Sequence, residues 1–176
     1  MTETKTAFQT VTEEVNKSLI QDTRNDDTKF YKFADDAPAW IDKAQVSLKC
    51  HEALDDRFPD DWVYEQMYFI TSDLCNYSDV ETAEAAQDAM GDIADGLVDV
   101  YNMDRVKWLA LDINNAFLCD EAAEEFGWDK DTMKEQGLYG LIGMGQYLAI
   151  ERIGNALIEC IEAEANEREN TEEADD

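Results

Sequence analysis

The chain is poor in residues that break helices and in residues that build metal or catalytic centres. Its 176 residues include two prolines, eight glycines and one histidine, and no C-x-x-C pair joins its four cysteines, Cys50, Cys75, Cys119 and Cys160. Few prolines and glycines leave long stretches free to be helical. One histidine with dispersed cysteines excludes the usual zinc sites and the di-iron pattern, which needs Glu-x-x-His twice. We therefore expect no metal and no cofactor.

Long apolar runs are missing as well. No stretch approaches the ~20 apolar residues of a membrane span, and residues 1–10 are polar, unlike the apolar core of a secretory signal. Each cysteine lies in an apolar-rich stretch, where a free thiol behaves as a small buried hydrophobe. We expect a cytoplasmic protein with reduced cysteines and no membrane association.

Positive charge is scarce. Forty-two acids against fourteen bases give a net charge of −28, far beyond the magnitude of roughly 2–8 that keeps a small domain soluble. Such self-repulsion opposes folding, so solubility alone does not explain it. Membranes and nucleic acids are anionic and would repel the chain, which leaves basic proteins or cations as partners. A salt-rich cytoplasm also selects for acidity, but such chains usually shed lysine, and this one has nine lysines to five arginines.

The apolar residues, 44% of the chain, recur at helical spacing and predict an all-α, single-domain bundle of about five to six helices with an acidic surface. Residues 1–34 predict an N-terminal helix (7–20) and a polar linker, residues 35–165 an acidic helical bundle, and residues 166–176 a disordered acidic tail. No alternating pattern predicts a sheet. Further helices are expected at 36–55, from 59, at 79–101, at 104–126 and from 131 or 137 to 165. The helix from 36 is expected to bury Ile41, Ala44 and Leu48. The helix from 59 is expected to bury Trp62, Val63, Met67, Ile70 and Leu74.

The expected helix at 79–101 carries a row of acids and begins at an S-x-x-E capping box, Ser78 and Glu81. The row, called the acidic ladder below, consists of Glu81, Glu84, Asp88, Asp92, Asp95 and Asp99. Offsets of three or four residues place these carboxylates on one helix face over roughly 27 Å. The distance between neighbouring members, measured between their Cβ atoms, is similar to that between successive phosphates along a nucleic-acid strand. Like charges so placed destabilise a helix, yet no lysine or arginine occurs between Arg57 and Arg105. The ladder is therefore the candidate partner-binding site.

Other interpretations stay open beside this one. A row of charge is most often a plain solvated face. Catalysis is not indicated: His51 follows Cys50, but adjacent helical residues point about 100° apart, and the glycine-rich stretch 137–145 lacks the Gly-Lys-Ser/Thr ending of a phosphate loop. We therefore expect no enzyme. The apolar stretch Leu138–Ile142 would allow two copies to form a homodimer.

The chain resembles the acidic, helical DNA mimics with which phages and mobile elements inhibit host defence, namely antirestriction and anti-CRISPR proteins. The resemblance rests on its small size, its charge, the ladder and the missing catalytic residues. The likeness covers mainly residues 35–176 and is one of class, so no family's binding residues are transferred. It implies that acidic side chains replace phosphates in the positive channel of a basic DNA- or RNA-binding protein or complex in the host cytoplasm, without direct binding of nucleic acid. The alternative is a phage-type interaction or assembly module that binds a basic partner without competing with DNA.

Overall fold

The computed structural model describes residues 5–23, 29–41, 43–54, 60–77, 80–98, 124, 127 and 129–174. The predicted helical class is confirmed, because five helices and one two-stranded sheet make up the elements of the described residues. In chain order these elements are α1 (Ala7–Ser18), β1 (Leu19–Thr23), β2 (Lys29–Phe33), α2 (Lys43–Ala53), α3 (Asp60–Asn76), α4 (Ala83–Leu97) and α7 (Lys130–Ala174).

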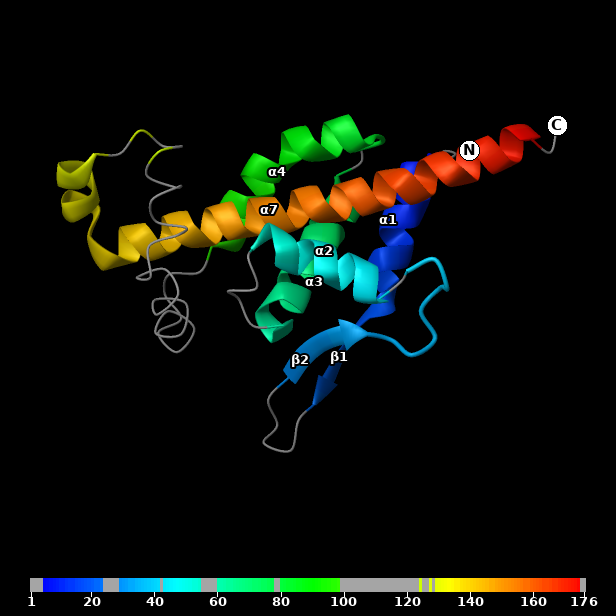
Figure 1. Ribbon diagram of the computed structural model, residues 1–176, viewed down its shortest axis with the longest axis horizontal. Helices are drawn as coiled ribbons and strands as arrows, with labels where there is room; N and C mark the ends of the chain where they lie inside the picture. Colours follow the sequence, from blue (N-terminus) through cyan, green and yellow to red (C-terminus); the bar gives the residue numbers. More distant parts are fainter. Residues whose placement is uncertain are drawn as a thin grey trace.

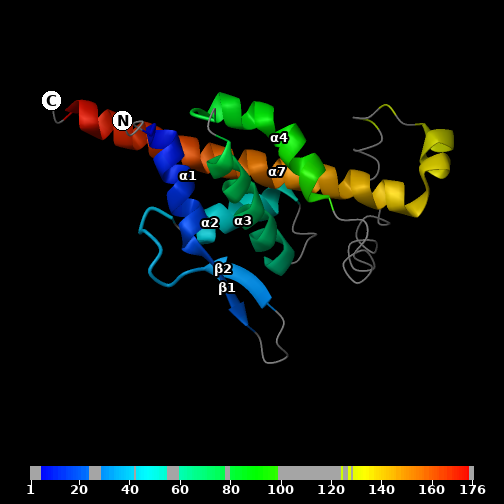
Figure 2. The same ribbon diagram turned by 180° about the vertical axis from the view of Figure 1, so that it is seen from behind.

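Helix α7 is the axis of the fold. It has 45 residues, which at ~1.5 Å per residue is roughly 67 Å of helix. It packs against α1, α2, α3 and α4, with α4 along one side and α2 along another (Figures 1 and 2). Its central turns lie in the core, where Leu148, Ile150, Ile153, Leu157 and Ile161 are almost completely buried.

The end of α7 corrects the prediction of a disordered tail. The sequence placed the last helical residue near Ala165, but the helix continues to Ala174. Arg168 holds this extension against the bundle: Nη2 lies 2.5 Å from Glu14 of α1, and Nε donates to Glu164 at 3.0 Å. The guanidinium also lies 5.7 Å from the centre of the Trp40 ring. The contacts of Arg168 with Glu14 and Trp40 are tertiary, and helical periodicity does not reveal them. Together with the i, i+4 pair to Glu164 within α7, they support the additional turns.

The small sheet corrects a second prediction, since part of it lies in the expected polar linker. Strands β1 and β2 pair antiparallel with Leu19 opposite Phe33 and Thr23 opposite Lys29. Aromatic contacts with α3 hold the hairpin: the rings of Tyr31 and Tyr68 stack with centroids 4.4 Å apart, and Phe33 meets Tyr64 edge-on at 5.7 Å. Offset and edge-on aromatic pairs stabilise beyond their buried area, so the strands depend on partners far away in the sequence.

The predicted core of α3 is confirmed, because Trp62, Val63, Met67, Ile70 and Leu74 are all buried. Helix α2 differs more from its prediction. It begins at Lys43, because Pro38 and Ile41 form a turn closed by a 3.0 Å backbone hydrogen bond before it. Its buried positions include Val46 and Cys50, whereas Leu48 is 55% exposed. Ile41 is buried as expected, and the Ala44 side chain lies outside the described residues. The helix expected at 104–126 also lies outside the described residues, apart from Glu124.

Candidate partner-binding surface

Helix α4 carries most of the acidic ladder, and its N-cap fixes where the ladder becomes helical. Thr82 has an extended backbone, and its side-chain oxygen accepts a 3.2 Å hydrogen bond from the N–H of Ala85. Such a cap satisfies one of the amide donors that a helix leaves unpaired at its start. The predicted helix start at 79 was therefore wrong, because Glu81 precedes the N-cap and α4 begins at Ala83. Ser78, the other member of the predicted capping box, lies outside the described residues.

The later start shortens the helical part of the ladder. Of the six predicted site residues, Glu84, Asp88, Asp92 and Asp95 lie within α4, and all four are exposed. Glu81 is also exposed but precedes the N-cap, and Asp99 lies outside the described residues. From Glu84 to Asp95 the row covers about 16 Å at 1.5 Å per residue, against the roughly 27 Å that the sequence predicted for all six. The four carboxylates within α4 are called the helical ladder below.

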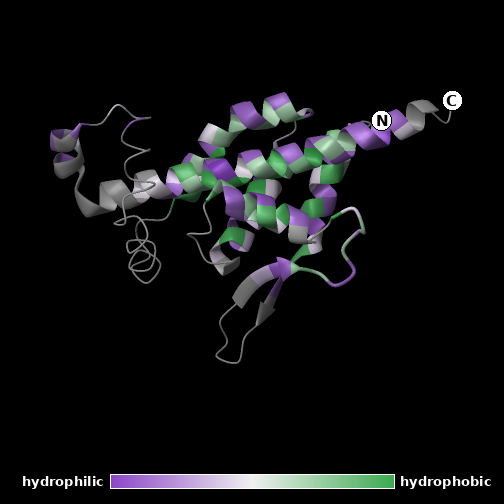
Figure 3. Ribbon diagram, viewed as in Figure 1, coloured by the Kyte–Doolittle hydropathy of each residue, from purple (hydrophilic) through white to green (hydrophobic). Residues whose placement is uncertain are grey.

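The face of α4 opposite the ladder is buried. Its buried residues are Ala83, Ala86, Met90, Ile93 and Ala94. This face packs on α7, along which α4 runs antiparallel (Figure 1). Hydrophilic and hydrophobic residues alternate along both helices in Figure 3, as expected for helices with one buried side. Burial of one face leaves the carboxylates only the solvent side.

Two glycines bring α4 and α7 close together, which sequence reasoning missed. A Cβ atom added at Gly154 of α7 would lie 2.2 Å from Cε of Met90, and one added at Gly91 of α4 would lie 3.2 Å from the hydroxyl of Tyr147. Each helix thus has a glycine facing a large side chain of the other. Close packing of this kind holds a helix in a defined position, so the ladder is fixed relative to the core.

The C-terminal half of α7 carries a second set of exposed acids, Glu159, Glu162, Glu167 and Glu169. Part of the acidic charge in this region is neutralised within the protein, since Lys49 of α2 lies 3.3 Å from Glu159 and Arg168 pairs with Glu164. By contrast, no lysine or arginine among the described residues forms an ion pair with the helical ladder. The ladder is thus a row of carboxylates without internal counterions in the described part of the chain.

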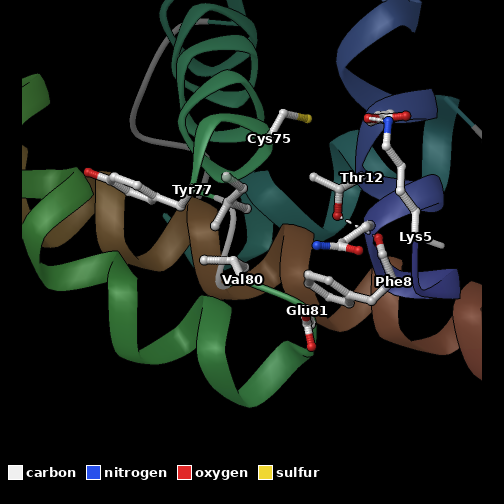
Figure 4. Close-up of a pocket in the computed structure, with 10 residues that line it drawn as sticks. Lys5, Phe8, Thr12, Cys75, Tyr77, Val80 and Glu81 are labelled. Carbon is white, nitrogen blue, oxygen red and sulfur yellow. Dashed lines mark hydrogen bonds and ion pairs between the residues drawn. The ribbon is translucent and has the colours of Figure 1, made fainter. Parts of the chain in front are cut away.

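A groove of about 490 Å³ lies beside Glu81, between α1 and the C-terminal end of α3 (Figure 4). Phe8 and Val80 contribute apolar surface, and Lys5 pairs with Glu13 at its α1 side. The hydroxyl of Thr6 donates to the Glu81 carbonyl at 2.7 Å, which ties the start of α1 to the start of the ladder. With one cation and two carboxylates, the lining of this groove adds little net charge to the ladder.

Two observations bear on metal binding and on the reactivity of Cys50. The described residues contain no group of three or more His, Cys, Asp or Glu side chains that could hold a metal ion. Burial, with a smaller contribution from the neighbouring Cys160, raises the pKa of the Cys50 thiol to about 12. A thiol must ionise to act as a nucleophile, so Cys50 behaves as a core residue. In the same part of the chain, no helix combines the length and apolar character needed to cross a membrane.

The described residues thus form a mostly helical fold. One of its helices, α4, buries one face and displays a row of exposed carboxylates on the other. Comparison with known proteins adds no relative: the chain matches no protein-family model, no curated protein and no solved structure.

Proposed function

We propose that this protein is a non-catalytic DNA mimic, which binds a basic nucleic-acid-binding protein in the cytoplasm and occupies the surface that nucleic acid would use. The proposed target is a host defence nuclease, a restriction enzyme or a CRISPR complex. The observation that carries the proposal is the helical ladder, in which Glu84, Asp88, Asp92 and Asp95 are all exposed on one side of α4 and pair with no described cation.

Preorganisation supports this role. A binding surface that is rigid before association avoids the free-energy cost of ordering its side chains and backbone during binding. The N-cap at Thr82 and the close approach at Gly154 fix α4 before any partner arrives. Negative charge so arranged raises the rate of encounter with a basic surface, and salt weakens this attraction.

The charge density of the row limits what it can imitate. The helical ladder places one carboxylate per roughly 5.5 Å of helix axis, whereas one strand of duplex DNA carries one phosphate per about 3.4 Å. The ladder therefore corresponds to a few phosphate positions along one strand rather than to a full duplex. We expect its salt dependence to be shallower than that of DNA binding to the same partner.

A pull-down with competing DNA tests the proposal. The tagged protein is incubated with nuclease-treated bacterial lysate at low and high salt, with and without added duplex DNA. A ladder variant (Asp88→Asn, Asp92→Asn and Asp95→Asn) is compared with a variant of equal charge change on α7 (Glu135→Gln, Glu162→Gln and Glu169→Gln). The proposal predicts that the tagged protein captures a nucleic-acid-binding protein, and that added DNA or high salt releases this partner. The α7 variant should still capture the partner, whereas the ladder variant should not.

The other outcomes separate the alternatives. Capture that duplex DNA does not disturb would favour an assembly module that binds a basic partner elsewhere. Equal loss of capture in the ladder and α7 variants would show that total charge, not the ladder, governs binding. Undiminished capture by the ladder variant would mean that the ladder is a solvated face and would overturn the proposal.

A further inference from the structure

A second candidate surface lies between α2 and α7, on a different side of α7 from α4 (Figures 1 and 2). It is a groove of about 440 Å³. Each helix lines it with residues at i, i+3, i+4 and i+7: Gln45, Leu48, Lys49 and Glu52 from α2, and Cys160, Ala163, Glu164 and Glu167 from α7. Residues at these spacings form one stripe along a helix. A groove between two such stripes has the shape that receives a third helix.

Part of the lining of this α2–α7 groove is apolar. Leu48 is 55% exposed, more than the other large hydrophobic residues that stand out from the described surface. A single exposed leucine is ordinary, but this one lies in a groove also lined by Trp40, Val46 and Ala163. The side chain of Val46 is buried, that of Trp40 is half-buried, and Ala163 is exposed. Together they form an apolar strip that a partner's side chain could cover.

The charged residues that line the groove are mostly acidic. Lys49 is the basic residue that lines it, and this lysine is already paired with Glu159 at 3.3 Å. Glu52 on α2 and Glu167 on α7 are exposed carboxylates on its two walls. An occupant must therefore combine an apolar stripe with positive charge on both flanks.

We propose that the α2–α7 groove docks an amphipathic helix of a partner protein whose apolar stripe is flanked by lysines or arginines. The apolar side chains of that helix would lie against Leu48 and Trp40, and its cations would meet Glu52 and Glu167. The site does not require the ladder to act as a DNA mimic. Charge alone attracts any basic protein, whereas an apolar stripe between charges selects among them.

A peptide titration tests the groove with defined probes. The first probe is a fluorescein-labelled leucine–lysine peptide about four helical turns long, with all leucines on one face, and the second is its scrambled isomer of equal charge. Because Leu48 is half exposed, its contact with the first probe should be worth about 5-fold in affinity, and Leu48→Ser should lose this factor. Ile20→Ser, at a 40% exposed apolar residue of β1, is the matched control and should bind like the parent protein.

The location of binding is read from the cysteines. Cys160 lines the groove and is half-buried, whereas Cys75 on α3 is exposed and lies outside it. Saturating leucine–lysine peptide should slow alkylation of Cys160 and leave Cys75 unaffected, as followed by mass spectrometry. The ladder variant should keep this protection, which separates the groove from the proposed function of the ladder.

Four results would overturn the proposal. Equal loss of affinity in Leu48→Ser and Ile20→Ser, or unchanged alkylation of Cys160, would show that the peptide binds through diffuse charge. Equal affinity for the two peptide isomers would show that no helical stripe is recognised. A concentration-dependent dimer in sedimentation that Leu48→Ser abolishes would show that a second copy of this chain occupies the groove.

Discussion

Neutralising three carboxylates of the helical ladder should stabilise the protein while weakening its binding to a basic partner. The variant carries Asp88→Asn, Asp92→Asn and Asp95→Asn and retains Glu84. Glu84 is kept because it lies in the first turn of α4, where the helix dipole favours negative charge. Stability should rise while binding weakens, and these opposite signs test whether the acids serve binding rather than folding.

The magnitude follows from the spacing of the acids. Glu84 with Asp88, Asp88 with Asp92, and Asp92 with Asp95 are like-charge pairs three or four residues apart, each destabilising by roughly 0.2–0.5 kcal/mol. The variant removes all three pairs. It also removes the charge of Asp95 from the end of α4, where the dipole disfavours an anion by about 0.3–1 kcal/mol. A gain of about 1–2.5 kcal/mol results, and each kcal/mol raises the Tm by about 2–4 °C in a chain of this length.

Calorimetry at low salt and at high salt measures this gain. Because salt screens exposed charges, the difference in Tm between variant and parent should shrink at high ionic strength. The α7 variant (Glu135→Gln, Glu162→Gln and Glu169→Gln) controls for the change in net charge. A lower Tm for the ladder variant at low salt would refute the reasoning, because it would mean that the carboxylates make favourable contacts.

Three further changes test the packing and the pH dependence. Gly154→Ala should destabilise by about 1–3 kcal/mol through overpacking against Met90, and the better helix propensity of alanine should offset roughly 1 kcal/mol of this cost. In a denaturant double-mutant cycle, the same substitution should destabilise less in a Met90→Val background. Arg168→Met should cost about 1 kcal/mol and speed amide exchange over residues 166–174, with little added effect of Glu14→Gln in that background. Burial raises the pKa of Asp73, which favours its neutral form in the folded protein. Asp73→Asn should therefore stabilise at neutral pH. The difference in denaturation midpoint should begin to shrink as pH falls through the raised pKa and disappear near the ordinary carboxyl pKa of the unfolded chain.

The sequence predicts the parts of this fold that rest on helical periodicity. The buried face of α3 and that of α4 both follow from apolar residues spaced three or four apart, and the structure buries them. The exposure of Glu84, Asp88, Asp92 and Asp95 follows from the same pattern, because a helix with one buried face turns the other toward solvent.

The features that the sequence did not reveal depend on tertiary contacts. The hairpin is short, and Tyr31 is held by Tyr68 of α3, a partner that no local pattern identifies. The last turns of α7 look like a solvated acidic tail until Arg168 is seen to reach Glu14 of α1. The start of α4 was misplaced because both Ser78 and Thr82 are good N-cap residues, and local sequence did not decide between them.

Energetics explain why a row of acids can persist on α4. The helix has 15 residues, contains Gly91 and Gly96, and bears like charges three or four apart, so on its own it would be a marginal helix in water. Burial of Met90 and Ile93 against the core contributes about 1.5–3 kcal/mol per side chain, which exceeds the roughly 0.2–0.5 kcal/mol cost of each like-charge pair. The conformation of α4 is therefore set by its packing on α7, and the residues of its outer face are free to serve binding. The fold of such a helix does not require the exposed acids Glu84, Asp88, Asp92 and Asp95, where lysine would stabilise, and the proposed binding of a basic partner would account for them.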